Sequence, residues 1–130
     1  MTTTNISVVL CVDDNQIVTD LFAKRLSKYN IITLKASIPI AALALIRENK
    51  DTIRAVVTDI QFSPQDINGV DLTKHIRRFE TDSSLEPMPI VGVSGHSMYR
   101  RPFMEAGGTE FFEKPLKQAD IEYIVNTYLI

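Results

Sequence analysis

The sequence lacks several features that would mark a secreted, metal-rich or nucleic-acid-binding protein. Its single cysteine, Cys11, can form no internal disulfide, and its two histidines are too few for a dense metal cluster. The net charge of −2 gives no strong attraction to nucleic acid or to an anionic membrane surface. No basic and then apolar leader opens the chain, and no apolar run approaches membrane-spanning length. We therefore expect a cytoplasmic protein with no membrane insertion and no direct nucleic-acid contact.

The length and composition favour one globular domain. A chain of 130 residues matches the commonest size of a single domain. Apolar residues make up 45% of the chain and charged residues 23%, which provides material for a core and gives no sign of disorder. We expect a single domain over residues 1–130.

Short runs rich in Val and Ile alternate with longer segments of helical period. The expected strands are residues 8–12, 31–36, 55–60, 89–94 and 110–112. The first expected helix runs from after Asp14 to about Lys28, and the second begins at Ser37. The third spans residues 69–79, the fourth ends at Gly107, and the fifth spans about 117–129. This alternation predicts an α/β fold, a doubly wound five-stranded parallel sheet with helices on both faces.

Two of the helical segments have an apolar face at helical spacing, which predicts how they pack. The first presents Val18, Leu21, Phe22 and Leu26, with only Arg25 interrupting. In the third, the expected inward residues are Val70, Leu72 and Ile76, and the expected solvated ones are Lys74, Arg77 and Arg78.

Acidic side chains gather where the expected strands end. Asp13 and Asp14 follow the first strand, and Asp59 lies at the end of the third. A lone aspartate at such a position is usually a turn or helix cap. Three converging carboxylates, however, repel one another unless a hard divalent cation neutralises them. Mg²⁺ is the natural candidate because it often bridges one or two carboxylates to a phosphate.

Two further residues lie at the same edge of the expected sheet. Ser94 ends the fourth strand and could donate its hydroxyl to an anion. Lys114 follows the last strand and precedes Pro115, so its ammonium could pair with a carboxylate or a phosphoryl oxygen. In an open parallel sheet, ligands bind beyond the carboxyl ends of the strands.

The ordered set Asp13-Asp14, Asp59, Ser94 and Lys114-Pro115 resembles the receiver domains of two-component response regulators. The resemblance covers essentially the whole chain, with each motif at the end of the appropriate strand. It implies a flavodoxin-like sheet of order 2-1-3-4-5.

By this resemblance, Asp59 is the nucleophile that accepts a phosphoryl group from a kinase phosphohistidine. Asp14 is a direct Mg²⁺ ligand, and Asp13 acts on the ion mainly through water. Asp59 itself and the backbone carbonyl of Gln61 complete the implied metal site.

The resemblance also implies a phosphoryl-binding and switch set. Ser94 and Lys114 are expected to bind phosphoryl oxygens, and Phe111 lies where the family has its switch aromatic. Gln61 and His96 are expected to tune dephosphorylation. His75, which lies in a helix, is interpreted as a surface residue.

The chain departs from the usual family pattern in two places. The connection over residues 61–69 is about two residues longer, and the span from Ser94 to Lys114 is about two residues shorter. Because Arg100-Arg101-Pro102 falls in the shorter span, we expect a curtailed fourth helix. Ser94-Gly95-His96 resembles receivers attached to hybrid sensor kinases, so a stand-alone protein and an excised module both stay open.

The preferred function is a phosphorylation-dependent signalling switch that turns over no separate metabolite and is therefore not an enzyme in the usual sense. Its expected partners are a sensor histidine kinase or phosphotransfer protein and an unknown downstream protein. One alternative is an Mg²⁺-dependent aspartyl-phosphate phosphatase of haloacid-dehalogenase type, whose Asp-x-Asp motif after the first strand is absent. The other alternative is a pseudo-receiver that binds partners without phosphorylation.

Overall fold

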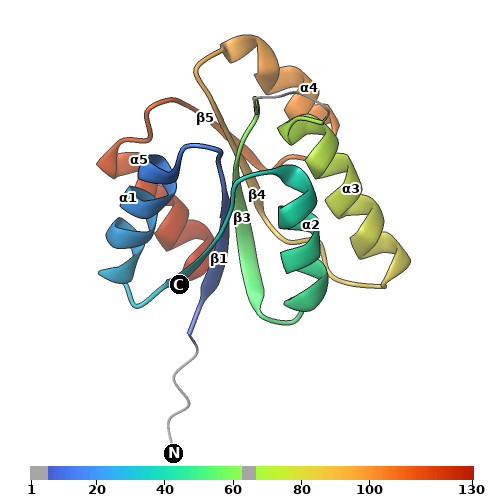
Figure 1. The fold of residues 1–130 in the computed structure, drawn as a ribbon, viewed down its shortest axis with the longest axis horizontal. Helices are drawn as coiled ribbons and strands as arrows, with labels where there is room; N and C mark the ends of the chain where they lie inside the picture. Colours follow the sequence, from blue (N-terminus) through green and yellow to red (C-terminus); the bar gives the residue numbers. More distant parts are fainter. Residues whose placement is uncertain (1–5, 63–66) are drawn as a thin grey trace, which may run out of the picture.

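Five parallel strands form the centre of the structure, a computed structural model that describes residues 6–62 and 67–130. They are β1 (Val8–Val12), β2 (Ile32–Ala36), β3 (Ile53–Asp59), β4 (Ile90–Ser94) and β5 (Glu110–Glu113). Their order in the sheet is β2-β1-β3-β4-β5, and all four neighbouring pairs are parallel (Figure 1). The doubly wound α/β fold predicted from the sequence is confirmed.

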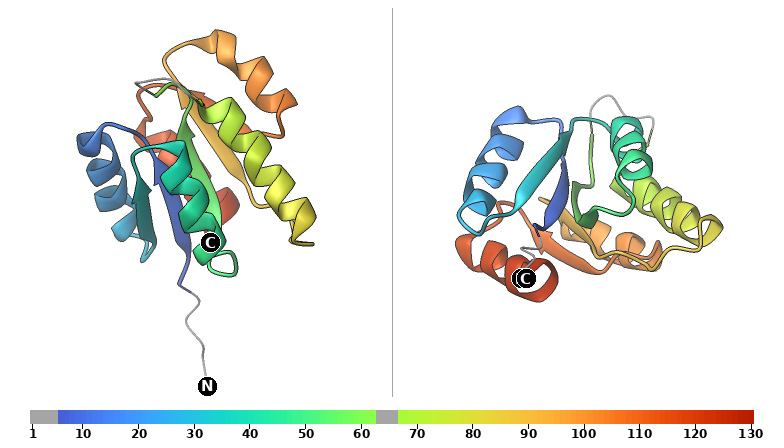
Figure 2. Two further views of the ribbon diagram at one scale, coloured as in Figure 1. Left: turned by 45° about the vertical axis from the view of Figure 1, so that its right-hand side comes forward. Right: turned by 90° about the horizontal axis from the view of Figure 1, so that it is seen from below.

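Helices cover both faces of the sheet. They are α1 (Gln16–Ser27), α2 (Pro39–Glu48), α3 (Gly69–Asp82), α4 (Arg100–Glu105) and α5 (Gln118–Ile124). A three-residue 3₁₀ turn, η1 (Ser97–Tyr99), precedes α4, and a π-helical turn, η2 (Val125–Leu129), continues α5. The helices α1 and α5 pack on one face, and α2, α3 and α4 pack on the other (Figures 1 and 2).

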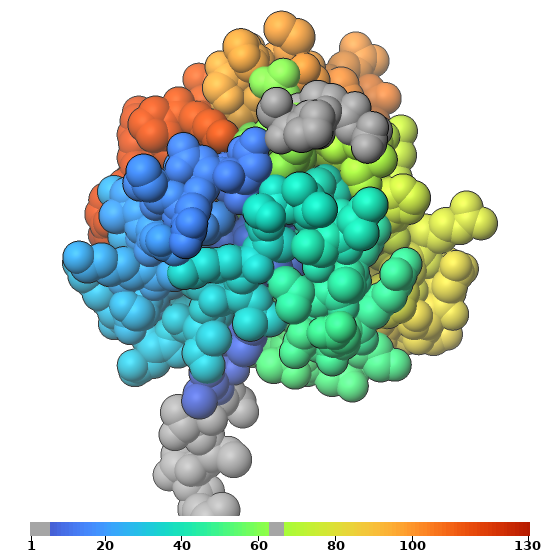
Figure 3. Space-filling view, in the orientation of Figure 1, coloured from blue at the N-terminus to red at the C-terminus, as the bar shows by residue number. Residues whose placement is uncertain are grey.

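The burial of the strands follows their place in the sheet. Every residue of the central strands β1 and β4 is buried, whereas the edge strand β2 has exposed positions such as Ile32. In β1, Leu10 packs into the core under α2, α3 and α4, and its neighbours Val9 and Cys11 pack under α1 and α5. This alternation is the two-residue period of a strand with both faces covered. In the space-filling view, α1, β2 and α2 form the front surface and cover the central strands (Figure 3).

The boundaries of several elements differ by one or two residues from the sequence prediction. β3 begins at Ile53 instead of Ala55 and ends at Asp59, and β2 begins one residue late. The expected curtailed helix is confirmed, since α4 has six residues and contains Pro102. Gly107 then takes a positive φ of 109°, a conformation that suits glycine and ends this helix. The expected longer connection after Gln61 includes residues 63–66, which lie outside the described residues.

Arg77, predicted to be solvated, lies instead in a polar network at the C-terminal half of α3. Its Nη1 is 2.8 Å from Glu80 Oε1 and donates to the Met88 carbonyl at 2.8 Å, and its Nε donates to the Gly107 carbonyl at 3.0 Å. The Glu80 carboxylate is 3% exposed and also accepts from the Met88 backbone N–H at 2.7 Å. The prediction was wrong because these loop carbonyls come near the helix only in the folded chain.

The start of β1 and the last turn of the chain touch at the end of the sheet opposite the acidic residues. There the Ser7 hydroxyl donates to the Leu129 carbonyl at 2.6 Å, and both residues are buried. In Figure 1 this contact lies near the lower end of β1, where the C-terminus is marked. Among the helices of residues 6–62 and 67–130, none has the length and apolar character needed to cross a membrane.

Candidate functional site

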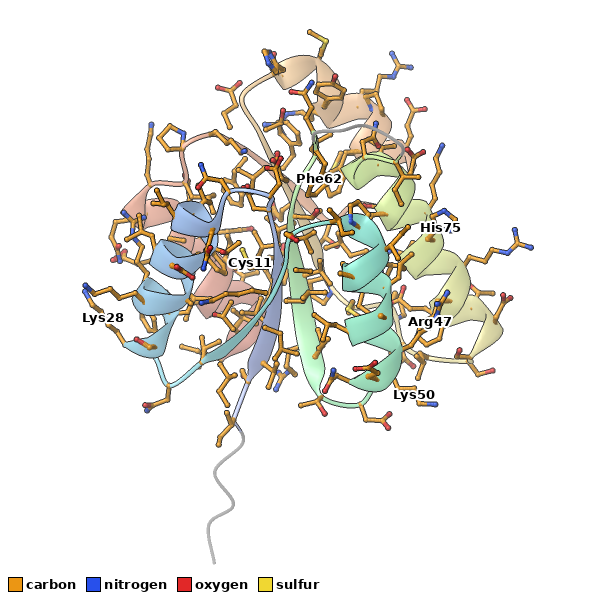
Figure 4. All side chains as sticks on the ribbon, in the orientation of Figure 1. Cys11, Lys28, Arg47, Lys50, Phe62 and His75 are labelled. Carbon is orange, nitrogen blue, oxygen red and sulfur yellow. The ribbon has the colours of Figure 1, made fainter. Side chains whose placement is uncertain are left out.

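Three carboxylates meet at the carboxyl end of the sheet. Asp59 is the last residue of β3, and Asp13 and Asp14 directly follow the neighbouring strand β1. One oxygen from each carboxylate lies within 4.8 Å of the others. Asp13 and Asp59 are buried and Asp14 is exposed, so the cluster is open to solvent on one side. Figure 4 labels Phe62, three residues after Asp59, near the upper end of β3. The structure thus brings together the acidic residues that the sequence singled out.

The Asp59 carboxylate is held by two backbone groups and one cation. Its Oδ1 accepts from the Ile60 N–H at 2.8 Å and from the Gln61 N–H at 3.4 Å, and its Oδ2 is 3.1 Å from Lys114 Nζ. These contacts orient the carboxylate before any ligand arrives.

The first residue of α3 packs directly on the backbone at Asp59. The Gly69 N–H donates to the Ile60 carbonyl at 2.7 Å. A Cβ at position 69 would lie 2.8 Å from Ile60 Cα and would also overlap the Asp59 carbonyl oxygen. Only glycine therefore allows this approach, which connects the start of α3 to the end of β3.

The pKa of Asp59 is raised above its usual range, for reasons visible in the geometry. Burial disfavours the charged form, and the Lys114 ammonium opposes this by lowering the pKa. The nearby Asp13 carboxylate raises the pKa again, and burial and Asp13 together outweigh the lysine. A cation in the cluster would relieve both effects. The donors are carboxylate oxygens, the ligand type that Mg²⁺ prefers, so the residues fit such an ion.

The Lys114 ammonium lies between two of the carboxylates, and its side chain is 36% exposed. Its Nζ is 3.1 Å from Asp59 Oδ2 and 3.6 Å from Asp13 Oδ2. Burial alone would lower the pKa of the ammonium, but the two carboxylates outweigh burial and raise it, so the lysine is charged at neutral pH. The Lys114 N–H also donates to the Ser94 carbonyl at 2.9 Å, and the Lys114–Pro115 peptide bond is cis.

Ser94 ends β4, and Phe111 lies on the neighbouring strand β5, opposite Gly92 and therefore two residues before Ser94 in the register. Ser94 is 1% exposed, and its hydroxyl oxygen accepts from the His96 N–H at 3.1 Å. Phe111 is 4% exposed, with its ring centroid 6.3 Å from that of Phe103. The Arg100 guanidinium lies 4.9 Å from the Phe111 ring centroid, at cation–π distance. Phe111 thus occupies an inward position covered by an arginine to which the sequence analysis gave no role.

Gln61 and His96 lie in the loops after β3 and β4, and both are exposed. The Gln61 side-chain amide donates to the Tyr99 hydroxyl at 3.1 Å. Sequence reasoning missed Tyr99, because no motif distinguishes a tyrosine in this position from any other surface aromatic. His75 is exposed on α3, on its outer side in Figure 4, as expected for a surface residue.

A pocket of about 220 Å³ opens beside the cluster, between α1 and the connection from β5 to α5. Its lining includes Val18 and Leu21 of α1, Leu116, and the site residues Asp59 and Lys114. Val18 and Leu21 are 41% and 48% exposed, so this part of the apolar face of α1 is not buried. Helical period identified the correct face, but it could not show that the neighbouring element leaves this part uncovered.

Comparison with known proteins assigns the family. The family model described as response regulator receiver domain matches residues 9–126, and the chain belongs to this family. Among curated proteins, it is 29% identical over 119 residues to the sensor histidine kinase GacS of Pseudomonas protegens. It is also 29% identical over 123 residues to the hybrid signal transduction histidine kinase L of Dictyostelium discoideum. These matches cover 90% and 92% of this chain but only 12% and 7% of the relatives.

Solved structures share the fold. The receiver domain of NtrX from Brucella abortus matches with a TM-score of 0.76 and 27% identity, covering 91% of this chain and 94% of that one. The receiver domain of Ssk1 from Saccharomyces cerevisiae, solved with the histidine phosphotransfer protein Ypd1, matches with a TM-score of 0.84 and 21% identity. That match covers 96% of this chain and 90% of the other. The fold and the family together define a receiver domain of two-component signalling.

Proposed function

We propose that residues 1–130 form one receiver domain that acts as a phosphorylation-controlled switch, with Asp59 as the phosphoryl acceptor. The observation that carries this proposal is the buried Asp59 carboxylate, which lies within 4.8 Å of two further carboxylates and 3.1 Å from Lys114. At neutral pH a carboxylate needs no general base to act as a nucleophile. The domain changes only its own covalent state and turns over no separate metabolite.

Mg²⁺ is the proposed cofactor of this site. Asp14 and Asp59 would hold the ion directly, Asp13 mainly through water, and Gln61 through its backbone carbonyl. When bound, the ion neutralises negative charge on the carboxylates and on the phosphoryl oxygens. The close approach of three carboxylates and the raised pKa of Asp59 both indicate negative charge in the cluster that such an ion would compensate.

In the proposed transfer, an Asp59 carboxylate oxygen forms a bond to phosphorus while the bond from phosphorus to the donor nitrogen breaks. The donor histidine leaves with the bonding electron pair and takes up a proton. Lys114 and the Ser94 hydroxyl bind the phosphoryl oxygens. Phosphoryl transfer depends mainly on in-line positioning and charge stabilisation, which such groups supply.

The proposed readout of phosphorylation involves Ser94 and Phe111. The Ser94 hydroxyl oxygen accepts from the His96 N–H, so its proton can be donated to a phosphoryl oxygen. Phe111 is the neighbour of Gly92 on β4, two residues before Ser94, and it is already in an inward position. A shift of Ser94 toward the phosphoryl group would thus favour the inward conformation of Phe111. It would also favour the α4 surface that accompanies this conformation.

The proposed donor is the phosphohistidine of a sensor histidine kinase or of a phosphotransfer protein. Curated relatives of this chain are histidine kinases, and the Ssk1 receiver is solved with a phosphotransfer protein. Apolar side chains at Ile17, Val18 and Leu21 are exposed on α1 beside the acceptor. Val18 and Leu21 line the same pocket as Asp59, so this exposed apolar surface suits a contact with a protein donor. The proposed downstream partner is a protein of unknown identity.

Intact-mass measurement after exposure to phosphoramidate and Mg²⁺ tests the proposal. We expect one phosphoryl adduct on the wild-type protein and none on Asp59→Asn. Asp20→Asn is a matched control, because Asp20 is an exposed aspartate of α1 paired with Lys35. Undiminished labelling of Asp59→Asn would contradict the assignment of the acceptor. Sustained hydrolysis of an added phosphoester would favour a haloacid-dehalogenase-like phosphatase, and a wild type without any adduct would favour a pseudo-receiver.

A further inference from the structure

Tyr99, the last residue of η1, contacts both residues expected to tune the lifetime of the phosphoryl group. Its hydroxyl oxygen accepts from Gln61 Nε2 at 3.1 Å. Its ring meets the His96 ring edge-on, with centroids 6.4 Å apart and an interplanar angle of 69°. Its backbone N–H donates to the His96 carbonyl at 3.2 Å. One side chain therefore joins the loop after β3 to the loop after β4.

The contacts continue from Tyr99 to the acceptor on both sides. On one side, the Gln61 N–H donates to Asp59 Oδ1 at 3.4 Å. On the other side, the His96 N–H donates to the Ser94 hydroxyl oxygen at 3.1 Å. β3 and β4 are neighbours in the sheet, with Asp59 opposite Val93. The contacts thus form a chain from the acceptor to the proposed phosphoryl-binding serine, with Tyr99 at its centre.

Tyr99 is better anchored than the glutamine that it holds. Its ring is half-buried and packs against the core cluster beneath α2, α3 and α4, and its backbone lies in η1, directly before α4. Gln61, in contrast, is exposed and lies in a loop. A long, exposed side chain loses rotamer entropy when it is held in one conformation. A hydrogen bond to an anchored hydroxyl reduces that cost at the moment of reaction.

We propose that Tyr99 is a positioning residue for hydrolysis of the Asp59 phosphoryl group, acting through Gln61; this inference rests on the proposed function. The bond to Tyr99 uses an N–H of the Gln61 amide and leaves its carbonyl oxygen Oε1 to accept from a water molecule. A glutamine that orients the attacking water is a recurring device in phosphoryl transfer.

The hydrolysis step itself needs only water as co-reactant. The water oxygen forms a bond to phosphorus on the side opposite the Asp59 oxygen. At the same time, the bond between phosphorus and the Asp59 oxygen breaks. The Asp59 carboxylate leaves with the electron pair, and the proton of the water passes to the released phosphate or to solvent. Tyr99 touches neither water nor phosphorus in this scheme, and it acts only by holding the amide.

Decay of the adduct in Tyr99→Phe tests the inference. This substitution keeps the ring and its contact with His96 but removes the hydroxyl. The protein is labelled with phosphoramidate and Mg²⁺, freed of both donor and product, and followed by intact mass. We expect the lifetime to lengthen by about two- to tenfold, the effect of one ordinary hydrogen bond on a rate. Gln61→Ala is expected to lengthen it at least as much, and adding Tyr99→Phe to Gln61→Ala is expected to have no further effect.

Two comparisons separate positioning from a general loss of structure. Tyr123→Phe removes a hydroxyl that donates to Glu110 at 2.8 Å, away from the acceptor loops, and is expected to decay like wild type. Tyr99→Phe is expected to keep the wild-type Mg²⁺ titration midpoint and full labelling. Equal decay in Tyr99→Phe and wild type, or additive effects in the double variant, would overturn the inference. Labelling of the wild-type protein would still support the proposed function in that case. Absence of any wild-type adduct would overturn both.

Discussion

At Asp59, burial and charge act on one carboxylate in opposite directions. Burial and Asp13 raise the pKa of Asp59 although Lys114 lies 3.1 Å away. A carboxyl whose pKa is raised on folding stabilises the fold most at low pH, and that contribution is lost as the pH rises through the raised value. The ionised site at neutral pH therefore costs folding free energy. A cation that bound the carboxylates would offset this cost, so metal binding and ionisation of Asp59 would favour each other.

Asp14→Ala is expected to weaken Mg²⁺ binding by at least about tenfold, because it removes a negative oxygen from a site that must neutralise a doubly charged ion. Asp14 is the exposed member of the cluster, so its loss leaves the buried pair in place. Titration of backbone amide NMR shifts with Mg²⁺ gives the midpoint. Asp20→Ala serves as the control, and identical midpoints for Asp14→Ala and wild type would count against the proposed metal site.

The thiol of Cys11 is expected to be unreactive in the folded protein. Burial, aided by the Asp13 charge, raises its pKa from 9.0 to about 12, and only the thiolate is nucleophilic. At pH 8 a thiol-specific disulfide reagent should react on the order of a thousandfold more slowly with native than with urea-unfolded protein. Because the unfolded thiol ionises first, stability should also fall as the pH rises from about 9 toward about 12. Equal rates in the two states would show that Cys11 is accessible.

Among the elements, α3 is secured at both ends by contacts of different kinds. At its start, Gly69 packs on the backbone at the end of β3, and near its end Arg77 and Glu80 bind the segment before β4 and the turn after α4. The helix therefore connects Asp59 at the end of β3 to the part of the molecule that contains the short α4.

Arg77→Ala is expected to destabilise the protein by about 2 to 3 kcal/mol, because it leaves the buried Glu80 carboxylate without its cation. This figure is below that for a fully buried pair, since Arg77 is 23% exposed. Urea unfolding followed by circular dichroism measures the change. Arg78→Ala is the matched control: its side chain is 84% exposed and 4.0 Å from Asp82, so the expected change is within about 0.5 kcal/mol. Similar midpoints for both variants would mean that the Arg77 network is not stabilising.

In the proposed switch, strands β4 and β5 convert phosphorylation into a change of packing. Ser94→Ala is expected to bind Mg²⁺ normally but to give less than about half of the wild-type change in the Phe111 ring resonances when beryllofluoride is added. The reason is that a ligand shifts a two-state equilibrium only through its differential interaction with the states. Ser97→Ala, in an exposed position of η1, is the control. A wild-type change in the Phe111 ring resonances of Ser94→Ala would show that Phe111 does not respond through the serine.

At the scale of the whole molecule, strand order is what made most of the site predictable. Parallel strands bring Asp13, Asp59, Ser94 and Lys114 to one edge regardless of side-chain detail, and the structure places them there. Features that depend on loops closing in space were not predictable. A charged residue such as Arg77 was interpreted as solvated because its carbonyl partners are distant in sequence. The Tyr99 contact with Gln61 spans 38 residues and has no periodic or motif signal.

The Ser7–Leu129 hydrogen bond brings the segment before β1 into contact with the last turn of η2. Since these two residues are hydrogen-bonded at the pole opposite the acceptor, a short Gly/Ser linker can join the ends, and new ends can be opened in the turn between α2 and β3. Such a circular permutant is expected to unfold cooperatively in urea and to take up one phosphoryl group on Asp59. A permutant without a cooperative transition would show that the order of the elements along the chain matters for folding. If it does fold, reporter groups can be attached at either new end. The turn between α2 and β3 lies at the start of β3, away from Asp59 at its end, so the reporters would not block the proposed site.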